Sequence, residues 1–389
     1  MDYHFADRVV ALQPSPTLAV SDRVRTLRQQ GLDVIDLGGG DPDFATPEHI
    51  CRAAAEAMAR GETHYVAGAG IPELRKAIAR KLAEDNGIDA DPATIIVTPG
   101  GKAAIFSAIL ALTGSGDDVV MFDPGWVSYE PIATMAGAGT IHVPLSVEDN
   151  YRITREAIDA ELTPRARVLI LNSPNNPTGR VLTRDELTAV AEVAQERDLI
   201  VIADEIYEKI IYDGNEHISI ATLPGMAERT LTVNGLSKAY AMTGWRLGYL
   251  TGPAPIIKQI EKVHSHSATC ATSFAQYGAV AAFEGPQDFI DMMVEAWDRR
   301  RHVLVAGLNA IPGFHCPMPE GAFYVFPDVS GTGLSGAEVA QRLIDEALVG
   351  VTPGGAFGAV CENHLRMSFA TSDAAIEQSL ERMARVFAA

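Results

Sequence analysis

Short apolar runs recur through the middle of the chain, and each is followed by a segment with helical periodicity. The runs lie at residues 94–98, 118–122, 168–171, 199–203 and 231–233. They do not alternate between apolar and polar residues, which indicates strands buried on both faces. Buried strands that alternate with helices are typical of a mainly parallel sheet covered by helices. We therefore predict an α/β fold whose ligands bind beyond the carboxyl ends of the strands.

A change in pattern near residue 285 divides the chain. The helical patterns that cover the sheet lie at 49–60, 71–86, 182–197 and 256–264. Beyond residue 285 come a long helical pattern at 288–308, a strand-like run at 322–326, a helix at 338–348 and a final helix from Ala374. We predict a large domain over 46–285 and a smaller α+β domain formed by 1–45 and 286–389.

Composition excludes several classes of function. Lys and Arg total 31 against 50 Asp and Glu, a net charge of −19, which disfavours nucleic acid and anionic membranes as partners. The four cysteines are far apart and form no zinc-site spacing, so we expect no metal. With no long apolar run and an acidic start, the expected location is cytoplasmic. An acidic chain that binds an anion must place its few cations locally.

Two stretches carry residues suited to an anionic, carbonyl-bearing ligand. Gly100-Gly101-Lys102 follows the 94–98 run and opens a helix, where free N–H groups can hold a phosphate. Taken alone, that stretch also suits an ordinary strand-to-helix turn. Ser237-Lys238 directly follows the 231–233 run, with Arg246 eight residues later. A lysine near other cations has a lowered pKa and can form Schiff bases, and Arg246 would be an anion clamp.

Six motifs in order resemble fold-type I pyridoxal-phosphate aminotransferases of class I/II, the aspartate-aminotransferase-like group. They are Gly39-Gly40-Asp41-Pro42-Asp43-Phe44, the run from Tyr65 to Arg75, Asn175-Asn176-Pro177-Thr178-Gly179, the pair Asp204 and Tyr207, Ser237-Lys238 with Arg246, and residues 365–370. The resemblance extends from about Pro14 to the C-terminus. It implies pyridoxal 5′-phosphate as cofactor, a three-layer large domain of the PLP-transferase type I fold, and a homodimer.

The resemblance also implies roles around the cofactor ring. Lys238 forms the Schiff base with the cofactor and moves the proton between substrate and cofactor carbons. Asp204 keeps the pyridine nitrogen protonated. Tyr207 and Asn176 hydrogen-bond the ring hydroxyl oxygen. Two side chains cover the ring faces: Trp126 and Ile206.

The remaining implied roles concern the phosphate and the substrate. The phosphate is held by Ser237, Arg246 and the backbone at Gly101, Lys102 and Ala103, with Tyr65 reaching across from a second subunit. Arg366 takes the substrate α-carboxylate in a bidentate fork. The other residues implied at the substrate are Gly40, Trp126 and Asn176.

The expected function is transfer of an amino group between an L-amino acid and a 2-oxo acid in two half-reactions. Some aspartate-specific relatives carry a basic residue in the helix after the phosphate loop, but here that face reads Ile105, Phe106, Ile109 and Leu110. A broad or non-dicarboxylate substrate range is therefore expected. Lys102, Arg180 or a partner-subunit residue could substitute.

Two other functions remain open from the sequence. One is a β-C–S lyase or another eliminating enzyme that uses the same cofactor. The other is a cofactor-binding regulatory domain, which the intact site residues disfavour.

Overall fold

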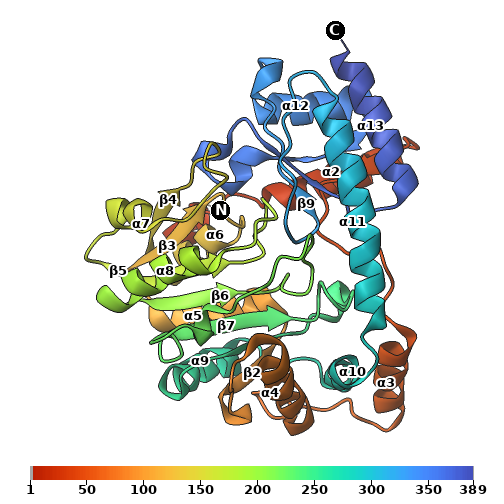
Figure 1. Cartoon of the computed structure of the whole chain (residues 1–389). Helices are drawn as coiled ribbons and strands as arrows, with labels where there is room; N and C mark the ends of the chain where they lie inside the picture. Colours follow the sequence, from red (N-terminus) through yellow and green to blue (C-terminus); the bar gives the residue numbers. More distant parts are fainter. Residues whose placement is uncertain (1–2, 389) are drawn as a thin grey trace.

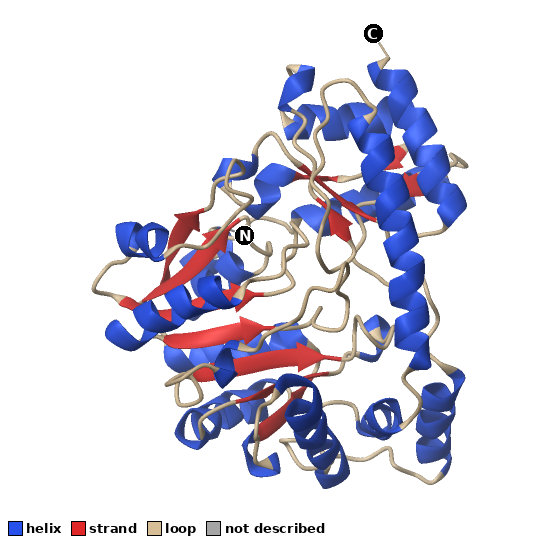
Figure 2. Ribbon diagram, in the orientation of Figure 1, coloured by secondary structure: helices blue, strands red, loops and turns tan. Residues whose placement is uncertain are grey.

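The computed structural model describes residues 3–388 and is built around one large sheet (Figures 1 and 2). The strand order is β2-β8-β7-β6-β5-β3-β4, and β8 is antiparallel to both of its neighbours while the other pairs are parallel. The strands are β2 (Ile95–Thr98), β3 (Asp118–Asp123), β4 (Gly139–Pro144), β5 (Ala166–Asn172), β6 (Ile200–Asp204), β7 (Thr230–Gly235) and β8 (Gly248–Thr251). The predicted α/β class with a mainly parallel sheet is confirmed.

The sheet is buried on both faces, as its apolar runs predict. In β3, Val119 and Met121 face one helical layer while Val120 and Phe122 face the other. The helices on the first face are α5 (Gly101–Leu112), α6 (Tyr129–Ala136) and α9 (Ala254–Ser267). The second face is covered by α7 (Arg155–Glu161), α8 (Arg184–Glu196), α4 (Pro72–Asn86) and α10 (Ser273–Glu284), and α3 (Glu48–Ala59) packs on α10. Three layers result, because neither sheet face can remain in water.

Two strands of this sheet, β4 and β8, were not predicted from the sequence. In β4 buried positions alternate with half-buried or exposed ones, as expected of an edge strand. In β8 the sequence Gly-Tyr-Leu-Thr is short and begins with glycine, which weakens its strand pattern. Neither resembles the continuous apolar runs of the inner strands.

Both ends of the chain contribute to the second part of the structure. β1 (Ile35–Asp36) pairs in parallel with β10 (Val349–Gly350), and β11 (Thr352–Pro353), β12 (Leu365–Ser368) and β9 (Tyr324–Val325) form a three-stranded sheet. The helices here are α1 (Asp7–Val10), α2 (Pro16–Gln29), α11 (Asp288–Asn309), α12 (Gly336–Arg342) and α13 (Asp373–Phe387). The predicted helix at 338–348 divides into α12 and a π-helical turn, Leu343–Ala347. We propose that these elements form the small domain.

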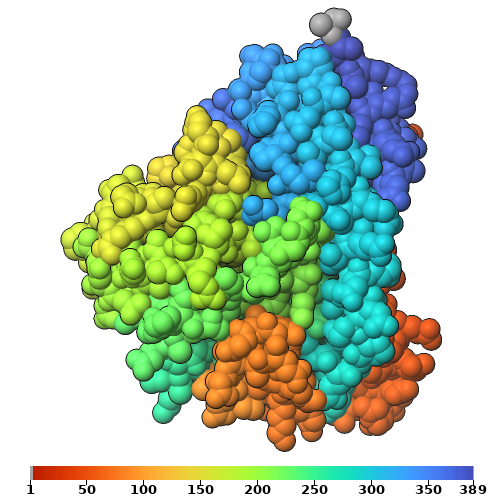
Figure 3. Space-filling view, viewed as in Figure 1, coloured from red at the N-terminus to blue at the C-terminus, as the bar shows by residue number. Residues whose placement is uncertain are grey.

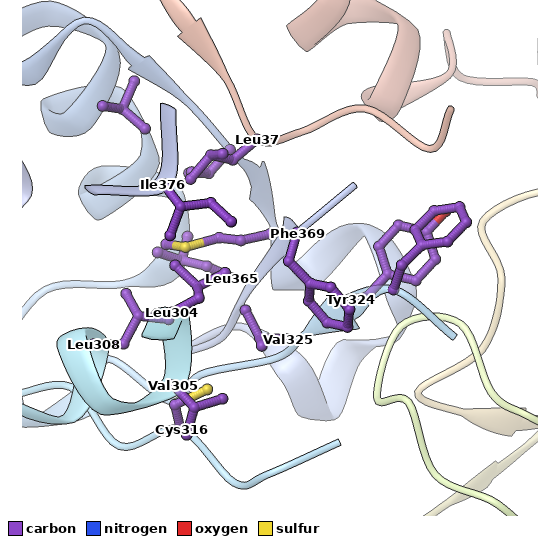
Figure 4. Close-up of a cluster of buried hydrophobic side chains, with 14 of the residues drawn as sticks. Leu37, Leu304, Val305, Leu308, Cys316, Tyr324, Val325, Leu365, Phe369 and Ile376 are labelled. Carbon is purple, nitrogen blue, oxygen red and sulfur yellow. The ribbon is translucent and has the colours of Figure 1, made fainter. Parts of the chain in front are cut away.

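One apolar cluster holds most of this second part together, and a smaller cluster of Val24, Leu27, Val34 and Ile344 packs α2 against the π-helical turn. Leu37 from the N-terminal segment lies near Leu304 and Leu308 of α11, Val325 of β9 and Ile376 of α13 (Figure 4). The cyan α11 runs along one side of the molecule from the upper, blue part toward the lower part (Figure 3). Among residues 3–388, no helix has the length and apolarity needed to cross a bilayer.

Gly248 of β8 is expected to be intolerant of any side chain. A Cβ at this position would collide with the backbone of Gly100 and Gly101, at the turn between β2 and α5. Gly248→Ala should lower the free energy of unfolding by about 2 kcal/mol, because backbone atoms cannot move aside easily. Urea unfolding will measure it, with Gly114→Ala as control, since a Cβ at Gly114 meets nothing within 4 Å. Equal stability of the two variants would contradict the prediction.

Candidate active site

A cavity of about 410 Å³ lies at the carboxyl ends of the parallel strands. It is lined by most of the residues predicted to act together: Gly40, Gly101, Lys102, Trp126, Asn176, Asp204, Ile206, Tyr207, Ser237, Lys238, Arg246 and Arg366. Strand register explains the convergence, because Asn172 pairs with Asp204 and Asp204 pairs with Val233, so β5, β6 and β7 end at one edge.

Lys238 lies just beyond the end of β7, with its amine inside the cavity. Its Nζ donates a hydrogen bond to the Gly40 carbonyl oxygen at 2.5 Å. The same Nζ lies 5.6 Å from the centre of the Tyr207 ring and 5.5 Å from that of Phe323. A Cβ on residue 40 would approach the Tyr324 hydroxyl to 2.7 Å, so glycine is needed for the chain to pass this close. The amine is thus held by a carbonyl and two aromatic rings.

Asp204, the last residue of β6, is a buried carboxylate. Tyr129 at the start of α6 donates a hydrogen bond to its Oδ2 at 2.8 Å. Burial raises the pKa of Asp204 to about 6, even though Tyr129, the Ile206 N–H and the charge of Lys238 all favour the ionised form. Burial also raises the pKa of Tyr129, so its phenol stays protonated as a donor. A cationic ligand group beside Asp204 would stabilise the buried negative charge of its carboxylate.

Tyr207 completes this side of the cavity. Its hydroxyl lies 2.9 Å from that of Tyr324, and burial raises the pKa of Tyr207. The Tyr207 phenol therefore stays protonated and able to donate. The Tyr207 ring meets the rings of Phe323 and Tyr324 edge-on, which fixes its orientation.

A second set of groups is suited to an anion. Arg246 has a left-handed backbone (φ 54°), and its guanidinium lies beside Gly100, where a Cβ would come within 2.7 Å of Nη2. It stands near the N-terminus of α5, whose free N–H groups favour negative charge. Burial and the charge of Arg246 lower the pKa of Lys102. Ser237 lines the same cavity, and together these groups fit a phosphate.

Arg366 of β12 is a buried cation whose hydrogen-bond partners are neutral. Only 3% of it is exposed; Nη2 donates to the Gly38 carbonyl at 2.6 Å and Nη1 to Asn176 Oδ1 at 3.2 Å, while Nε has no hydrogen-bond partner among residues 3–388. Its guanidinium lies 4.5 Å from the centre of the Tyr324 ring. A buried charge without a counter-ion is costly, so this arginine is prepared for an anionic ligand.

Three residues named in the sequence analysis do not line this cavity. Tyr65 is 86% exposed, and the Ala103 N–H donates to the Gly100 carbonyl within the first turn of α5. Arg180 pairs with Glu186 at 2.8 Å instead of facing the cavity. It is therefore not available in this chain to bind a distal substrate group.

Sequence reasoning missed two contributions. Tyr129 contacts Asp204 because of where α6 packs. The only sequence signal for this contact is that Tyr129 follows Trp126 by three residues. The first two turns of α2 and the residue before the helix also line the cavity, together with Ile105 and Val127. The residues from that segment are Ser15, Thr17, Leu18 and Ser21. No motif marks them, because their position depends on how α2 folds back.

Known proteins resemble this chain over nearly its whole length. A family model described as "Aminotransferase class I and II" matches residues 32–383. The chain is 47% identical to an aspartate aminotransferase of Musicola paradisiaca, over 97% of this chain and 95% of that protein. It is 44% identical to an aspartate/prephenate aminotransferase of Thermus thermophilus, over 97% of each. The structure of Thermus thermophilus aspartate aminotransferase with maleate superposes with a TM-score of 0.95 at 42% identity, covering 99% of this chain and 100% of that one.

The raised pKa of Asp204 predicts a pH-dependent stability in the ligand-free protein. The folded state holds this proton more tightly than the unfolded state, so rising pH should destabilise the fold between about pH 4 and pH 6. The Asp204→Asn variant has no titrating group at this position. The difference in free energy of unfolding between the variant and the wild type should therefore shift in favour of the variant by on the order of 3 kcal/mol between pH 4 and pH 7. Urea unfolding of the two proteins at both pH values will measure it. A difference independent of pH would contradict the prediction.

Proposed function

Because this chain belongs to the class I and II aminotransferases, which use pyridoxal 5′-phosphate, we propose that the cavity at the strand ends is its active site. The protein is a transaminase that acts on amino and 2-oxo acids. When bound, the cofactor supplies an aldehyde that takes up the amino group and a ring that withdraws electrons from the substrate Cα. One observation carries the assignment: a lysine amine lies in the same cavity as a buried carboxylate and two arginines.

We assign the phosphate to the end of the cavity at α5. Arg246 and Ser237 would bind its oxygens together with the N–H groups at Gly101 and Lys102. The assignment of Ala103 stays a prediction. Its support is the position of these groups on one wall, with Gly100 allowing Arg246 to approach closely.

We assign the ring to the space between Trp126 and Ile206, both of which line the cavity. Tyr129 orients Asp204, and the Asp204 carboxylate would be the counter-ion of the protonated ring nitrogen. Tyr207 and Asn176 would donate to the ring oxygen. Covalent attachment would then require Lys238 to release the Gly40 carbonyl oxygen.

The proton transfer falls to Lys238. Its amine lies in the same cavity and would be the base that takes up and returns the Cα proton when it is free. The Gly40 carbonyl oxygen, which accepts a hydrogen bond from Nζ here, can orient the freed amine. Arg366 would hold the substrate α-carboxylate through its unpartnered Nε, close to Asn176.

The substrate side chain would extend toward α2. That wall combines the hydroxyls of Ser15, Thr17 and Ser21 with the apolar side chains of Leu18 and Ile105. Hydroxyl donors suit a carboxylate, and the apolar surface suits a ring. We infer a range that includes aspartate and ring-bearing substrates, in keeping with the names of the two relatives. The comparisons give no support to the lyase alternative.

We also propose that the protein works as a cytoplasmic homodimer. Tyr65 is almost fully exposed, and its proposed role at the phosphate requires the cavity of a second copy. Exposed apolar side chains on the N-terminal segment also suit an interface: Tyr3, Phe5, Val9 and Val10.

Replacing the lysine tests the proposed function. Lys238→Ala should lower transamination by at least about 10³-fold, because it removes both the covalent attachment and the base. The protein mixed with pyridoxal 5′-phosphate should show a visible absorbance band that is absent from the variant. Activity is measured with aspartate and a panel of 2-oxo acids. A band and turnover that persist in Lys238→Ala would rule out the assignment.

The carboxylate assignment predicts a common effect on every substrate. Arg366→Lys keeps the charge but loses the planar fork, and KM should rise about 100-fold for amino and oxo acids alike. Steady-state kinetics with aspartate and with a ring-bearing amino acid will measure it. Arg167→Gln, near the opposite end of β5, is the control and should leave KM unchanged. A rise confined to one substrate would place Arg366 at the side chain instead.

A further inference from the structure

The turn that follows β6 presents side chains in two opposite directions. Asp204 and Tyr207, three residues apart, line the cavity. Glu205 and Glu208 have the same spacing, and their carboxylates bind residues outside the cavity. The turn is closed by a hydrogen bond of 3.0 Å from the Glu208 N–H to the Glu205 carbonyl. Because the two pairs alternate along residues 204–208, the bonds that hold Glu205 and Glu208 in place restrict how Asp204 and Tyr207 can turn.

The two glutamates belong to a buried group that we call the turn cluster. Its members are Lys81, Asn86, Glu205, Glu208, His217 and Ser219. Lys81 Nζ donates to Glu208 Oε1, and to Asn86 Oδ1 at 2.7 Å. The Asn86 amide donates to Glu205 at 3.2 Å and to Glu208 at 2.5 Å. Ser219 donates to Glu205 Oε1 at 2.6 Å, so both carboxylates are held at two oxygens.

Carboxylates lie next to a lysine and a histidine within the turn cluster. Burial opposes the charge on Glu208, yet Lys81, His217 and Asn86 outweigh it and lower its pKa. Burial likewise opposes a charged His217, but Glu205 and Glu208 raise its pKa, and its Nε2 lies 3.1 Å from Glu205 Oε2. Although the two carboxylates and His217 lie close enough to share a metal ion, the Lys81 ammonium already supplies the cation.

The turn cluster joins the turn after β6 to helix α4. Lys81 and Asn86 lie in the last two turns of α4, and Asp85 pairs with Lys209 at 2.7 Å beside them. Figure 3 shows the orange α4 region bordered by the green surface of the middle of the chain. Apolar residues of similar size would stabilise such an interface as well as buried ions do, but they would not fix its rotation. Paired directional bonds hold the turn in one orientation.

We propose that the turn cluster is a positioning device for the cofactor ring, acting through Glu205 and Glu208 to orient Asp204 and Tyr207. Lys81, Glu205 and Glu208 are then positioning residues that touch neither cofactor nor substrate. The inference rests on the proposed function, because it takes Asp204 and Tyr207 as the residues that hold the ring. It goes beyond that function by extending the site's architecture to α4, outside the cavity.

Three variants of the holoenzyme separate positioning from stability. In Lys81→Met the carboxylate of Glu208 is left buried without its cation, and in Glu208→Gln the cation loses its carboxylate. The double variant Lys81→Met/Glu208→Gln removes both charges and should recover most of the thermal stability. Asp118→Asn is the matched control, since Asp118 is a buried carboxylate that pairs with Arg165 at the far end of the sheet.

We expect all three cluster variants to bind pyridoxal 5′-phosphate about tenfold more weakly and to lose about tenfold in kcat, with little change in KM. The pH midpoint of the lysine-dependent absorbance band should move to higher pH, because a displaced Tyr207 donates less well to the ring oxygen. The control should lose thermal stability but keep cofactor affinity, midpoint and kcat.

Recovery of cofactor affinity in the double variant, in parallel with its stability, would overturn the inference and leave the turn cluster a purely structural role. So would an unchanged absorbance midpoint in all three cluster variants. Failure of the proposed function is distinguishable, since the wild type itself would then show no lysine-dependent band and no turnover.

Discussion

The register of three neighbouring strands determines where chemistry can occur in this protein. Asn172, Asp204 and Val233 are paired across β5, β6 and β7, so the segments that follow these strands leave the sheet at one edge. A ladder of backbone hydrogen bonds thereby places an amide loop, a carboxylate and a lysine around one cavity. Every other group at the site is positioned against this edge: α5 by its N-terminus, α6 through Tyr129, and β12 through Arg366. A slip of one residue in β6 would turn Asp204 away from the cavity.

Charge in the cavity differs sharply from charge over the whole chain. The protein carries a net charge of −19, yet Arg246 and Arg366 both face the cavity, and the second makes hydrogen bonds only to neutral oxygens. Burial raises the pKa of Asp204 to about 6, because the buried carboxylate is only partly compensated by its neighbours. The site is thus electrostatically incomplete at three points, and a molecule with a phosphate, a basic ring nitrogen and a carboxylate-bearing partner would satisfy all three. Folding has already removed these charged side chains from water, so binding such a ligand requires little further desolvation of the protein.

Sequence patterns predicted the inner strands and the cavity residues that directly follow them, because both depend on local order, while residues such as Trp126 and Arg366 were expected only from the family resemblance. Continuous apolar runs identify strands that are buried on both faces, and residues just after such strands must share an edge. The patterns failed where position depends on distant packing. Tyr129 reaches Asp204 through the placement of α6, and Ser15 and Thr17 reach the cavity because α2 folds back from the N-terminus. Arg180 was considered as a ligand for a distal substrate group, but it pairs with Glu186 of α8 and does not line the cavity.

The pairing of β1 with β10 also constrains the order in which parts of the fold can form. Ile35 meets Val349 across roughly 300 residues, a contact that is slow to form because the intervening loop must first be closed. During synthesis the sheet with Asp204 and Lys238 emerges well before β12 with Arg366. The residues assigned to the cofactor thus emerge before Arg366, but Phe323 and Tyr324, whose rings orient Tyr207, also lie in the late part of the chain. The cavity is therefore complete only after the C-terminal elements have packed against the sheet.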